Sequence, residues 1–280
     1  MTRPEPYKTF MQSRFIGIFD SGVGGLAVYR AARELLPNEA FVYVADSGFA
    51  PYGDREPGYI ASRVIEITDA LVKSGALALV IACNTATVTT ISELRAKHAL
   101  PIIGIEPAIK PATALSVTGK IVVLTTQRTA ESDAVARLCQ LYGNDSHIVL
   151  QACPGLADYV EAGEVDSIEV NEMLKQYLAT AIAISADVIV LGCTHFTFLT
   201  AQIQRLVGPD VTIIEPSTAV AQQLARQLTL ASPYLNHAAC ATELFYTTAT
   251  SSSTVSAVMS KLLERPIDVL TANHLGLVCR

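Results

Sequence analysis

The chain has 280 residues, half of them hydrophobic and 16% charged, with a formal net charge of −6. This composition supports a packed core and excludes a disordered or fibrous chain, and an acidic chain without a basic run is not a general nucleic-acid binder. The longest unbroken apolar run, Ala76 to Cys83, is far shorter than the roughly 20 residues of a membrane-spanning helix. The first six residues contain no apolar signal-peptide core. We therefore expect a soluble cytoplasmic protein without a membrane partner.

Short aliphatic runs alternate with amphipathic segments along the whole chain. A first series predicts strands and intervening helices in this order: strand 15–19, helix 26–36, strand 40–44, helix 58–73, strand 77–81, helix 87–98 and strand 102–105. A second series follows: strand 120–124, helix 132–142, strand 147–150, helix 170–185, strand 188–191, helix 200–207 and strand 211–214. The remaining tail predicts a helix after residue 218, strand 244–247, helix 254–264 and strand 267–270. This alternation is typical of parallel sheets with helical crossovers.

The two series resemble each other. Gly75–Thr85 aligns without a gap with Ser185–His195, so that Cys193 follows Cys83 by 110 residues. The fourth strands end in Glu-Pro pairs that are 109 residues apart. Two landmarks at nearly one offset indicate a duplication. We therefore predict an α/β fold of two pseudo-symmetric lobes, each a mainly parallel sheet flanked by helices, with the active site in the cleft between them. The first lobe would comprise residues 14–105 plus 216–280, and the second residues 106–215.

Chemistry-bearing residues follow several predicted strands. Ligands bind at the carboxyl ends of parallel strands, and Cys83 and Cys193 stand at two such ends. If the two sheets face each other, these thiols approach one cleft from opposite sides. A thiolate on one face of a carbon and a thiol on the other can invert a stereocentre by removing one proton and returning another.

Several motifs together resemble the glutamate racemases of the aspartate/glutamate racemase superfamily. They cover residues 15–215 and are Phe19–Leu26, Ala45-Asp46 with Pro51-Tyr52-Gly53, Ala82–Ala86, Gly104–Ala108 and Leu191–His195. The resemblance implies interconversion of L- and D-glutamate by two-cysteine proton transfer at the α-carbon, with D-glutamate supplied to peptidoglycan. It also implies no cofactor and no metal, and a homodimer. An aspartate racemase or another member of the superfamily is the alternative.

The resemblance also implies roles for individual residues. Cys83 and Cys193 would transfer the protons, with Asp20 assisting Cys83, and with His195 and Glu161 assisting Cys193. The glutamate would be bound by Asp20, Ser21, Pro51, Tyr52, Gly53, Cys83, Asn84, Thr85, Thr126, Thr129, Cys193, Thr194 and His195.

Two positions depart from the family pattern. Phe196-Thr197-Phe198 stands where the family has Tyr-Pro and an aliphatic residue, which we expect to alter the loop or the pocket depth beside Cys193. Arg128 replaces the glycine of a Thr-x-Gly-Thr loop, whose two threonines, Thr126 and Thr129, remain.

Other functions stay open at this point. Gly22–Ala27 fits the G-x-G-x-x-A dinucleotide fingerprint, and Asp46 ends the next strand, although the charge of Asp20 would oppose a pyrophosphate. A zinc hydrolase could use Cys83, Cys193 and His195 as ligands, and a Cys–His hydrolase could use one of the thiols. In a non-catalytic binding protein with two lobes, the cysteines would be packing residues. The six cysteines are dispersed without a C-x-x-C pair, which predicts reduced thiols.

Overall fold

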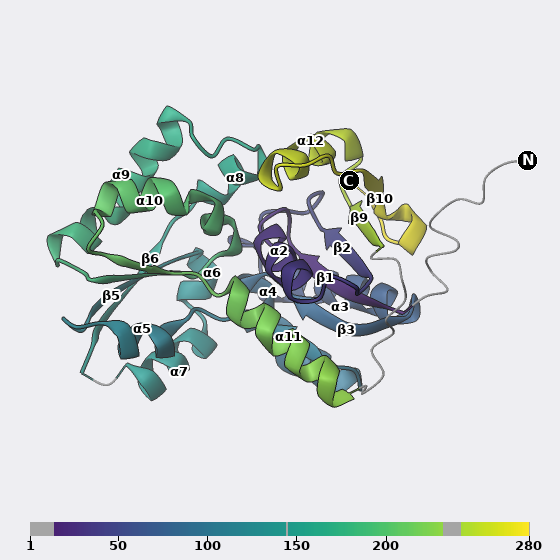
Figure 1. Cartoon of the computed structure of the whole chain (residues 1–280), viewed down its shortest axis with the longest axis horizontal. Helices are drawn as coiled ribbons and strands as arrows, with labels where there is room; N and C mark the ends of the chain where they lie inside the picture. Colours follow the sequence, from purple (N-terminus) through teal and green to yellow (C-terminus); the bar gives the residue numbers. More distant parts are fainter. Residues whose placement is uncertain (1–13, 144, 232–241, 280) are drawn as a thin grey trace, which may run out of the picture.

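A computed structural model describes residues 14–143, 145–231 and 242–279. Within these residues the chain forms two α/β lobes that lie side by side, each with a parallel sheet (Figure 1). The predicted fold class, two similar lobes with helices around parallel sheets, is confirmed. The N-terminal segment on which the signal-peptide argument rests lies outside the described residues, and so does Cys240. No helix in the described ranges is long and apolar enough to cross a membrane.

The first lobe is built on a six-stranded sheet. Its strands, in spatial order, are β10 (Val269–Thr271), β9 (Glu243–Thr247), β2 (Phe41–Ala45), β1 (Phe15–Asp20), β3 (Ala76–Ile81) and β4 (Ile102–Gly104). All residues of β1 and β2 are buried, as expected for central strands covered on both faces.

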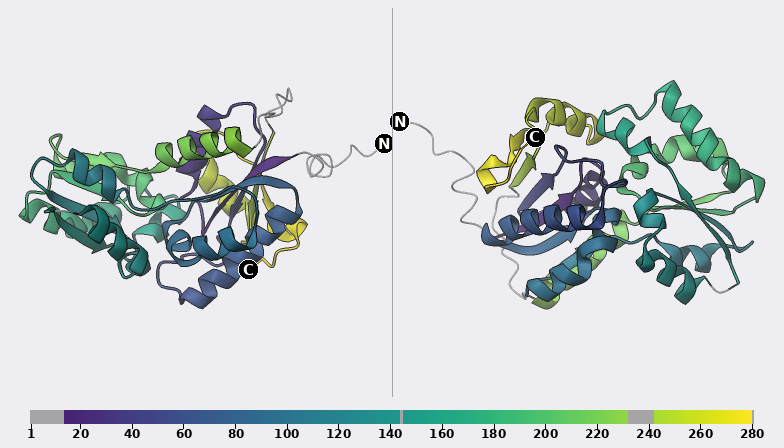
Figure 2. Two further views of the ribbon diagram at one scale, coloured as in Figure 1. Left: turned by 90° about the horizontal axis from the view of Figure 1, so that it is seen from below. Right: turned by 180° about the vertical axis from the view of Figure 1, so that it is seen from behind.

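The side chains of β1 alternate between two cores. Ile16 and Ile18 pack with helices α2 (Leu26–Leu35) and α11 (Ser217–Ala231) on one face. Phe15 and Phe19 pack with α3 (Pro57–Lys73) and α4 (Asn84–Lys97) on the other. The right-hand view of Figure 2 shows the blue ribbons of these helices on this face of the sheet, from behind. The period of two along a strand therefore divides one apolar run between two helical layers.

The second lobe repeats this plan with four strands. Their spatial order is β6 (His147–Ala152), β5 (Lys120–Thr125), β7 (Val188–Leu191) and β8 (Thr212–Ile214). This is the order in which β2, β1, β3 and β4 lie in the first lobe, so the duplicated sequence corresponds to a duplicated sheet. One face carries α9 (Ile168–Ala183) and α10 (Thr200–Val207), and the other carries α5 (Ile109–Leu115) and α7 (Asp133–Tyr142).

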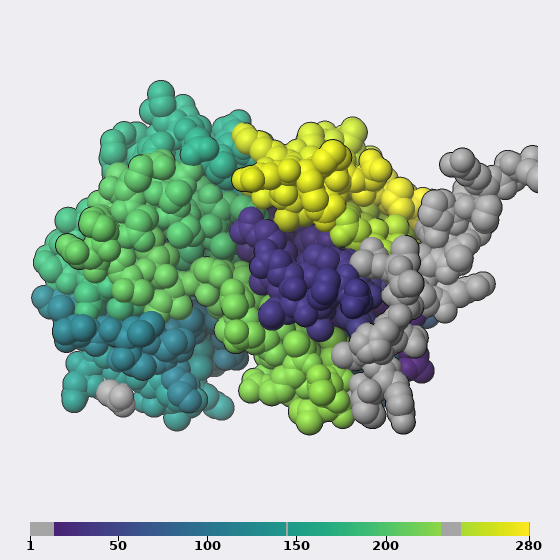
Figure 3. Space-filling view, viewed as in Figure 1, coloured from purple at the N-terminus to yellow at the C-terminus, as the bar shows by residue number. Residues whose placement is uncertain are grey.

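The end of the chain returns to the first lobe. After β8 the chain enters α11, which packs along α2, and strands β9 and β10 then extend the six-stranded sheet beside β2. Helix α12 (Ser252–Leu262) reaches the second lobe, where Lys261 Nζ donates a hydrogen bond to the carbonyl of Gly163 at 2.7 Å. Figure 3 shows this yellow segment against the teal surface of the second lobe.

Several element boundaries differ from the sequence-based prediction. Helix α4 begins at Asn84 rather than at residue 87, because Cys83 caps it: its sulfur accepts the backbone N–H of Ala86 at 3.5 Å. Helix α12 begins two residues before its predicted first residue, and strand β10 begins two residues after its predicted first residue. Short elements were not predicted; they are α5, α6 (Gln127–Ala130), α8 (Leu156–Glu161), η1 (Thr194–Leu199) and η2 (Ala272–Leu275). Segments of four to seven residues are too short to show a helical period.

Asp187 stabilises the turn that leads into β5. Its carboxylate accepts hydrogen bonds from Ser116 Oγ at 2.6 Å and from the backbone N–H groups of Val117 and Thr118 at 2.7 and 2.9 Å. Burial opposes the charged form, but these hydrogen bonds outweigh it and lower the pKa of Asp187 from 3.8 to about 2. The stabilisation is therefore present above pH 3.8 and is lost as the pH falls through about 2.

We predict that Asp187→Asn lowers the free energy of unfolding by about 1–2 kcal/mol at pH 7, and that the difference shrinks between about pH 4 and pH 2. Urea denaturation at several pH values measures this. Asp210→Asn, at an exposed position, is the control and should change stability by less than about 0.5 kcal/mol. A pH-independent loss in Asp187→Asn would contradict the assignment.

Candidate active site

A small cleft lies where the carboxyl ends of the two sheets meet. Its free volume is about 20 Å³, enough for one water molecule. Residues of both lobes line it: Ser21, Pro51, Tyr52, Gly53, Cys83, Asn84 and Thr85 from the first, and Thr126, Ala157, Cys193, Thr194 and His195 from the second. All of these were expected from the sequence except Ala157, which lies on α8 and carries no reactive group that could have indicated it.

The remaining expected residues, Asp20, Thr129 and Glu161, are not among the residues that line this cleft. Each is hydrogen-bonded to a residue that does: Asp20 to Thr194, Thr129 to Thr85, and Glu161 to His195. The structure therefore brings every sequence-predicted residue either to the cleft wall or directly behind it.

The two cysteines occupy equivalent places in the two lobes. Cys83 follows β3 and caps α4, and Cys193 follows β7 and precedes η1. Their exposed fractions are 5% and 6%. Both line the same cleft, so the duplicated halves place one thiol on each side of it.

The surroundings of Cys83 favour its neutral thiol form. Its sulfur lies 3.5 Å from Ser21 Oγ, to which it donates a hydrogen bond. Burial raises the pKa of Cys83 to about 12, and the nearby carboxylate of Asp20 contributes in the same direction. At neutral pH Cys83 therefore holds its proton.

A histidine and a carboxylate stand beside the other thiol. Cys193 Sγ lies 3.7 Å from His195 Nδ1, and His195 Nε2 lies 2.6 Å from Glu161 Oε1. Burial lowers the pKa of His195, but the contacts with Cys193 and Glu161 outweigh it and raise the pKa well above its ordinary value. The imidazole is thus positively charged near neutral pH and offers a charged donor to a thiolate.

The loop after β1 holds the carboxylate of Asp20. Asp20 is fully buried, and its Oδ2 accepts the backbone N–H groups of Gly22 at 3.2 Å and Gly25 at 3.0 Å. A Cβ at Gly25 would lie 2.8 Å from the Cβ of Asp20, so the close approach requires glycine. Burial raises the pKa of Asp20, while the positive charge of His195 and these N–H groups lower it in part.

The dinucleotide interpretation fails at this loop. The N–H groups that would bind a pyrophosphate are occupied by the carboxylates of the protein, since Glu161 Oε1 accepts the N–H of Val23 at 2.7 Å. A Cβ at Gly22 would lie 1.7 Å from that same oxygen. The fingerprint glycines make room for Asp20 and Glu161 instead of a phosphate.

A buried ion pair orients Tyr52 toward the cleft. The Tyr52 hydroxyl donates to Asp46 Oδ2 at 2.5 Å, and Arg63 Nη2 binds Asp46 Oδ1 at 2.6 Å. The Arg63 guanidinium also lies 3.7 Å from the centre of the Phe49 ring. Sequence reasoning missed Arg63; its signal was a cation among the apolar positions of a helix.

Hydroxyl groups join the two lobes at the floor of the cleft. Thr85 Oγ1 lies 3.0 Å from Thr126 Oγ1 and 3.2 Å from Thr129 Oγ1. The neighbouring Asn84 donates from Nδ2 to the carbonyl of Ile105 at 3.3 Å. Its Oδ1 is buried and has no hydrogen-bond partner among the described residues. This acceptor is therefore available to a donor that enters the cleft.

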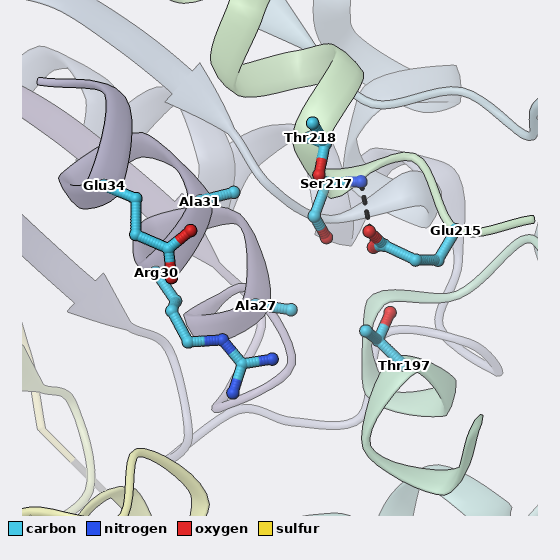
Figure 4. Close-up of a pocket in the computed structure, with 8 residues that line it drawn as sticks. All are labelled: Ala27, Arg30, Ala31, Glu34, Thr197, Glu215, Ser217 and Thr218. Atoms are coloured by element: carbon cyan, nitrogen blue, oxygen red, sulfur yellow. Dashed lines mark hydrogen bonds between the residues drawn. The ribbon is translucent and has the colours of Figure 1, made fainter. Parts of the chain in front are cut away.

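Thr197, one of the residues at which the sequence departs from the family pattern, lies at a different cavity. About 420 Å³ of space opens between α2, η1 and the start of α11, where Glu215 Oε2 accepts the N–H of Ser217 at 3.0 Å (Figure 4). Thr197 lines this second cavity and not the cleft. Its neighbour Phe196 is fully buried in the core. Any effect of this departure on the cleft is thus indirect.

The free cysteines and the candidate metal ligands can be listed for the described ranges. Five cysteines are free there: Cys83, Cys139, Cys153, Cys193 and Cys279. Residues 14–143, 145–231 and 242–279 contain no group of three or more His, Cys, Asp or Glu side chains arranged to hold a metal ion.

Comparison with known proteins gives a consistent result. The family model of the Asp/Glu/hydantoin racemases matches residues 16–224. The glutamate racemase of Ectopseudomonas mendocina is 45% identical over 214 residues, which cover 76% of this chain and 81% of that relative. The glutamate racemase of Methylococcus capsulatus is 42% identical over 231 residues, which cover 82% and 85% of the two chains.

Solved structures agree with the sequence relatives. Glutamate racemase isoform RacE1 from Bacillus anthracis matches with a TM-score of 0.84 and 32% identity, over 92% of this chain and 97% of the other. Escherichia coli glutamate racemase, solved with L-glutamate and the activator UDP-MurNAc-ala, matches with a TM-score of 0.82 and 28% identity, over 92% and 98%.

The charge on His195 is testable. We predict that Glu161→Gln lowers the pKa of His195, because the variant removes a carboxylate that favours the imidazolium. NMR titration of the His195 ring measures this change. Glu164→Gln, at an exposed position three residues further along the chain, is the control and should leave the His195 titration unchanged. An unaltered His195 pKa in Glu161→Gln would show that the carboxylate does not set the charge.

Proposed function

The chain belongs to the Asp/Glu/hydantoin racemase family and is an amino-acid racemase, and we propose that it interconverts L-glutamate and D-glutamate. The observation that carries the mechanism is the meeting of two thiols, one from each duplicated half, at a single cleft. The proposal of glutamate rests on the names of relatives that are 45% and 42% identical over most of the chain.

The proposed reaction moves only protons. A cysteine thiolate takes the α-proton of glutamate, so that a carbon–hydrogen bond breaks and a sulfur–hydrogen bond forms. The opposite thiol then gives its proton to the other face of the carbon and becomes the thiolate. Because the protonation states have exchanged, the product form of the site is ready for the reverse reaction.

The two sides of the cleft support this division of roles. Cys83, with a pKa of about 12, is protonated at neutral pH and would act as the acid, while the charged His195 would stabilise a thiolate at Cys193. In the opposite direction Cys83 must act as the base, and Asp20 is the buried group that would help to move its proton. Burial excludes water, so fixed donors would stabilise the carbanion-like transition state in a low dielectric.

The cleft also offers suitable groups for an amino acid. No lysine or arginine is among the described residues that line it, so hydroxyl groups and backbone N–H groups would bind the two carboxylates. The start of α4 contributes the positive end of a helix there. Asn84 Oδ1, which is buried without a partner in the described part of the chain, would accept a hydrogen bond from the α-ammonium group.

We place the product D-glutamate in peptidoglycan synthesis, on the resemblance to the glutamate racemase family. Growth of a bacterium that requires D-glutamate, after introduction of this gene, tests that role. The homodimer and the cytoplasmic location stay predictions, as does independence of cofactors. Activity without added pyridoxal phosphate and in the presence of a metal chelator tests the last of these.

The first test uses both enantiomers in heavy water. We predict that each is racemised and that deuterium appears at the α-carbon of the product. Cys83→Ala and Cys193→Ala should each reduce turnover about a thousandfold in both directions, because each removes one proton-transfer group. Cys139→Ala is the matched control, since this free cysteine lies on α7 away from the cleft lining, and it should retain activity.

The outcomes of that experiment separate the claims. Near-normal turnover in either cleft variant would refute the two-thiol mechanism. Activity on aspartate alone would refute the choice of substrate and leave the mechanism standing.

A second test addresses substrate binding. We predict that Asn84→Ala raises KM for both enantiomers about tenfold or more, because a hydrogen bond to a charged ammonium group is lost. Initial-rate kinetics measure KM, and the melting temperature controls for the lost bond to Ile105. An unchanged KM in a folded variant would exclude Asn84 from substrate binding.

A further inference from the structure

Arg128 connects the two lobes at the edge of the cleft. It belongs to α6 of the second lobe, beside Thr126 and Thr129, and it is one of the positions at which the sequence departs from its family pattern. Its backbone N–H donates to the carbonyl of Gly53 at 3.2 Å, and its side-chain Nε donates to the carbonyl of Arg55 at 3.1 Å. Its Nη2 lies 3.8 Å from Glu56 Oε1. One residue therefore contacts three positions of a first-lobe loop.

The same loop forms part of the cleft wall. Pro51, Tyr52 and Gly53 line the cleft, and the chain continues directly into the segment 53–56 that Arg128 contacts. At Gly53 the two lobes are in close contact, since a Cβ there would lie 3.1 Å from the Cβ of Thr126. The position of this loop thus determines how tightly the cleft is closed on that side.

The loop is held separately on the side of its own lobe. The Tyr52 hydroxyl binds Asp46, and the backbone N–H of Arg55 donates to the carbonyl of Tyr52 at 3.1 Å. The Arg55 guanidinium lies 5.5 Å from the centre of the Tyr59 ring on α3. These contacts stay within the first lobe. The backbone N–H of Arg128 fastens Gly53 of this loop to the second lobe, and the Arg128 side chain adds the contacts with Arg55 and Glu56.

The cleft in this arrangement is closed to substrate. Its free volume of about 20 Å³ holds one water molecule, far less than an amino acid such as glutamate requires. Entry and release of substrate therefore require the lobes or the loop to separate. The contacts that break in such a separation oppose it, and their strength sets the fraction of time for which the cleft is open.

We infer that Arg128 is a positioning residue that fastens the 53–56 loop across the cleft and thereby controls access of substrate to the two thiols. The identity of that substrate rests on the proposed function, but the control of access does not. Arg128 contacts neither thiol in the structure, so its effect is on opening and not on proton transfer itself.

Thiol alkylation measures this opening without reference to catalysis. Cys83 and Cys193 are 5% and 6% exposed, so a small neutral reagent such as iodoacetamide reaches them only when the cleft opens. We predict that Arg128→Ala speeds alkylation of both cysteines about fivefold, the effect expected for loss of a partly exposed hydrogen bond and ion pair. Site-resolved mass spectrometry measures each cysteine separately.

Opening of the cleft speeds alkylation, whereas loss of a nearby positive charge would slow it. A nearby cation favours the reactive thiolate, so an electrostatic effect alone would slow alkylation in Arg128→Ala. Cys139, partly exposed on α7, is the internal control, and its rate should not change unless the second lobe has loosened as a whole. Arg137 is an exposed arginine on α7, and Arg137→Ala is the matched control variant, which should leave alkylation of Cys83 and Cys193 unchanged. Arg128→Lys keeps a donor and a charge and should restore most of the protection.

Each outcome decides a specific point. Faster alkylation of Cys83 and Cys193 with Cys139 unchanged supports the inference, whether or not the wild-type protein racemises glutamate. If the wild-type protein does not racemise glutamate, the proposed function fails and the access control stands. Equal or slower alkylation in Arg128→Ala overturns the inference, as does equal acceleration at Cys139 or failure of Arg128→Lys to restore protection.

Discussion

Two carboxylates at the junction of the lobes, the fully buried Asp20 and the partly buried Glu161, hold the site together. Asp20 belongs to the first lobe and accepts N–H groups of its own glycine loop, while Glu161 comes from the second lobe and accepts an N–H group of that same loop. The fully buried Asp20 would be strongly destabilising without its partners, and the bond from the Val23 N–H group to Glu161 crosses between the lobes and keeps them in register. Glu161 also contacts His195, and the arrangement that joins the lobes therefore sets the charge beside Cys193.

The duplicated halves share a backbone plan but differ in chemistry. The aligned repeats pair Thr85 with His195, two residues after each cysteine. Thr85 bonds to Thr126 and Thr129 across the cleft, whereas His195 bonds to Cys193 and Glu161. Two residues after its cysteine, one side therefore carries a neutral hydroxyl group and the other a positively charged imidazole, so the two thiols lie in different surroundings. A two-base reaction benefits from this difference because one thiol must start as an acid and the other as a base.

Closure of the cleft shapes the chemistry of the site as much as the two thiols do. The buried cleft raises the pKa of Cys83 by removing water, and the same exclusion of water strengthens every charge interaction within the site. Such a site must open to function, and the contacts across its edge then control exchange with solvent. Arg128 lies at this edge and makes its contacts with backbone carbonyls and a glutamate of the facing loop.

Much of the fold and of the candidate site could be predicted from the amino-acid sequence. Aliphatic runs marked the strands because apolar β-strands must be covered on both faces, and the repeat around Cys83 and Cys193 indicated two similar lobes with a thiol at each strand end. Tertiary structure alone decided the pairing of Arg63 with Asp46, the contact of Val23 with Glu161, and the partners of Arg128. These contacts join residues that are 17 to 138 positions apart, and no local pattern encodes which distant groups meet. Periodicity records which face of an element is buried, whereas the partner of a buried charge depends on how the lobes pack.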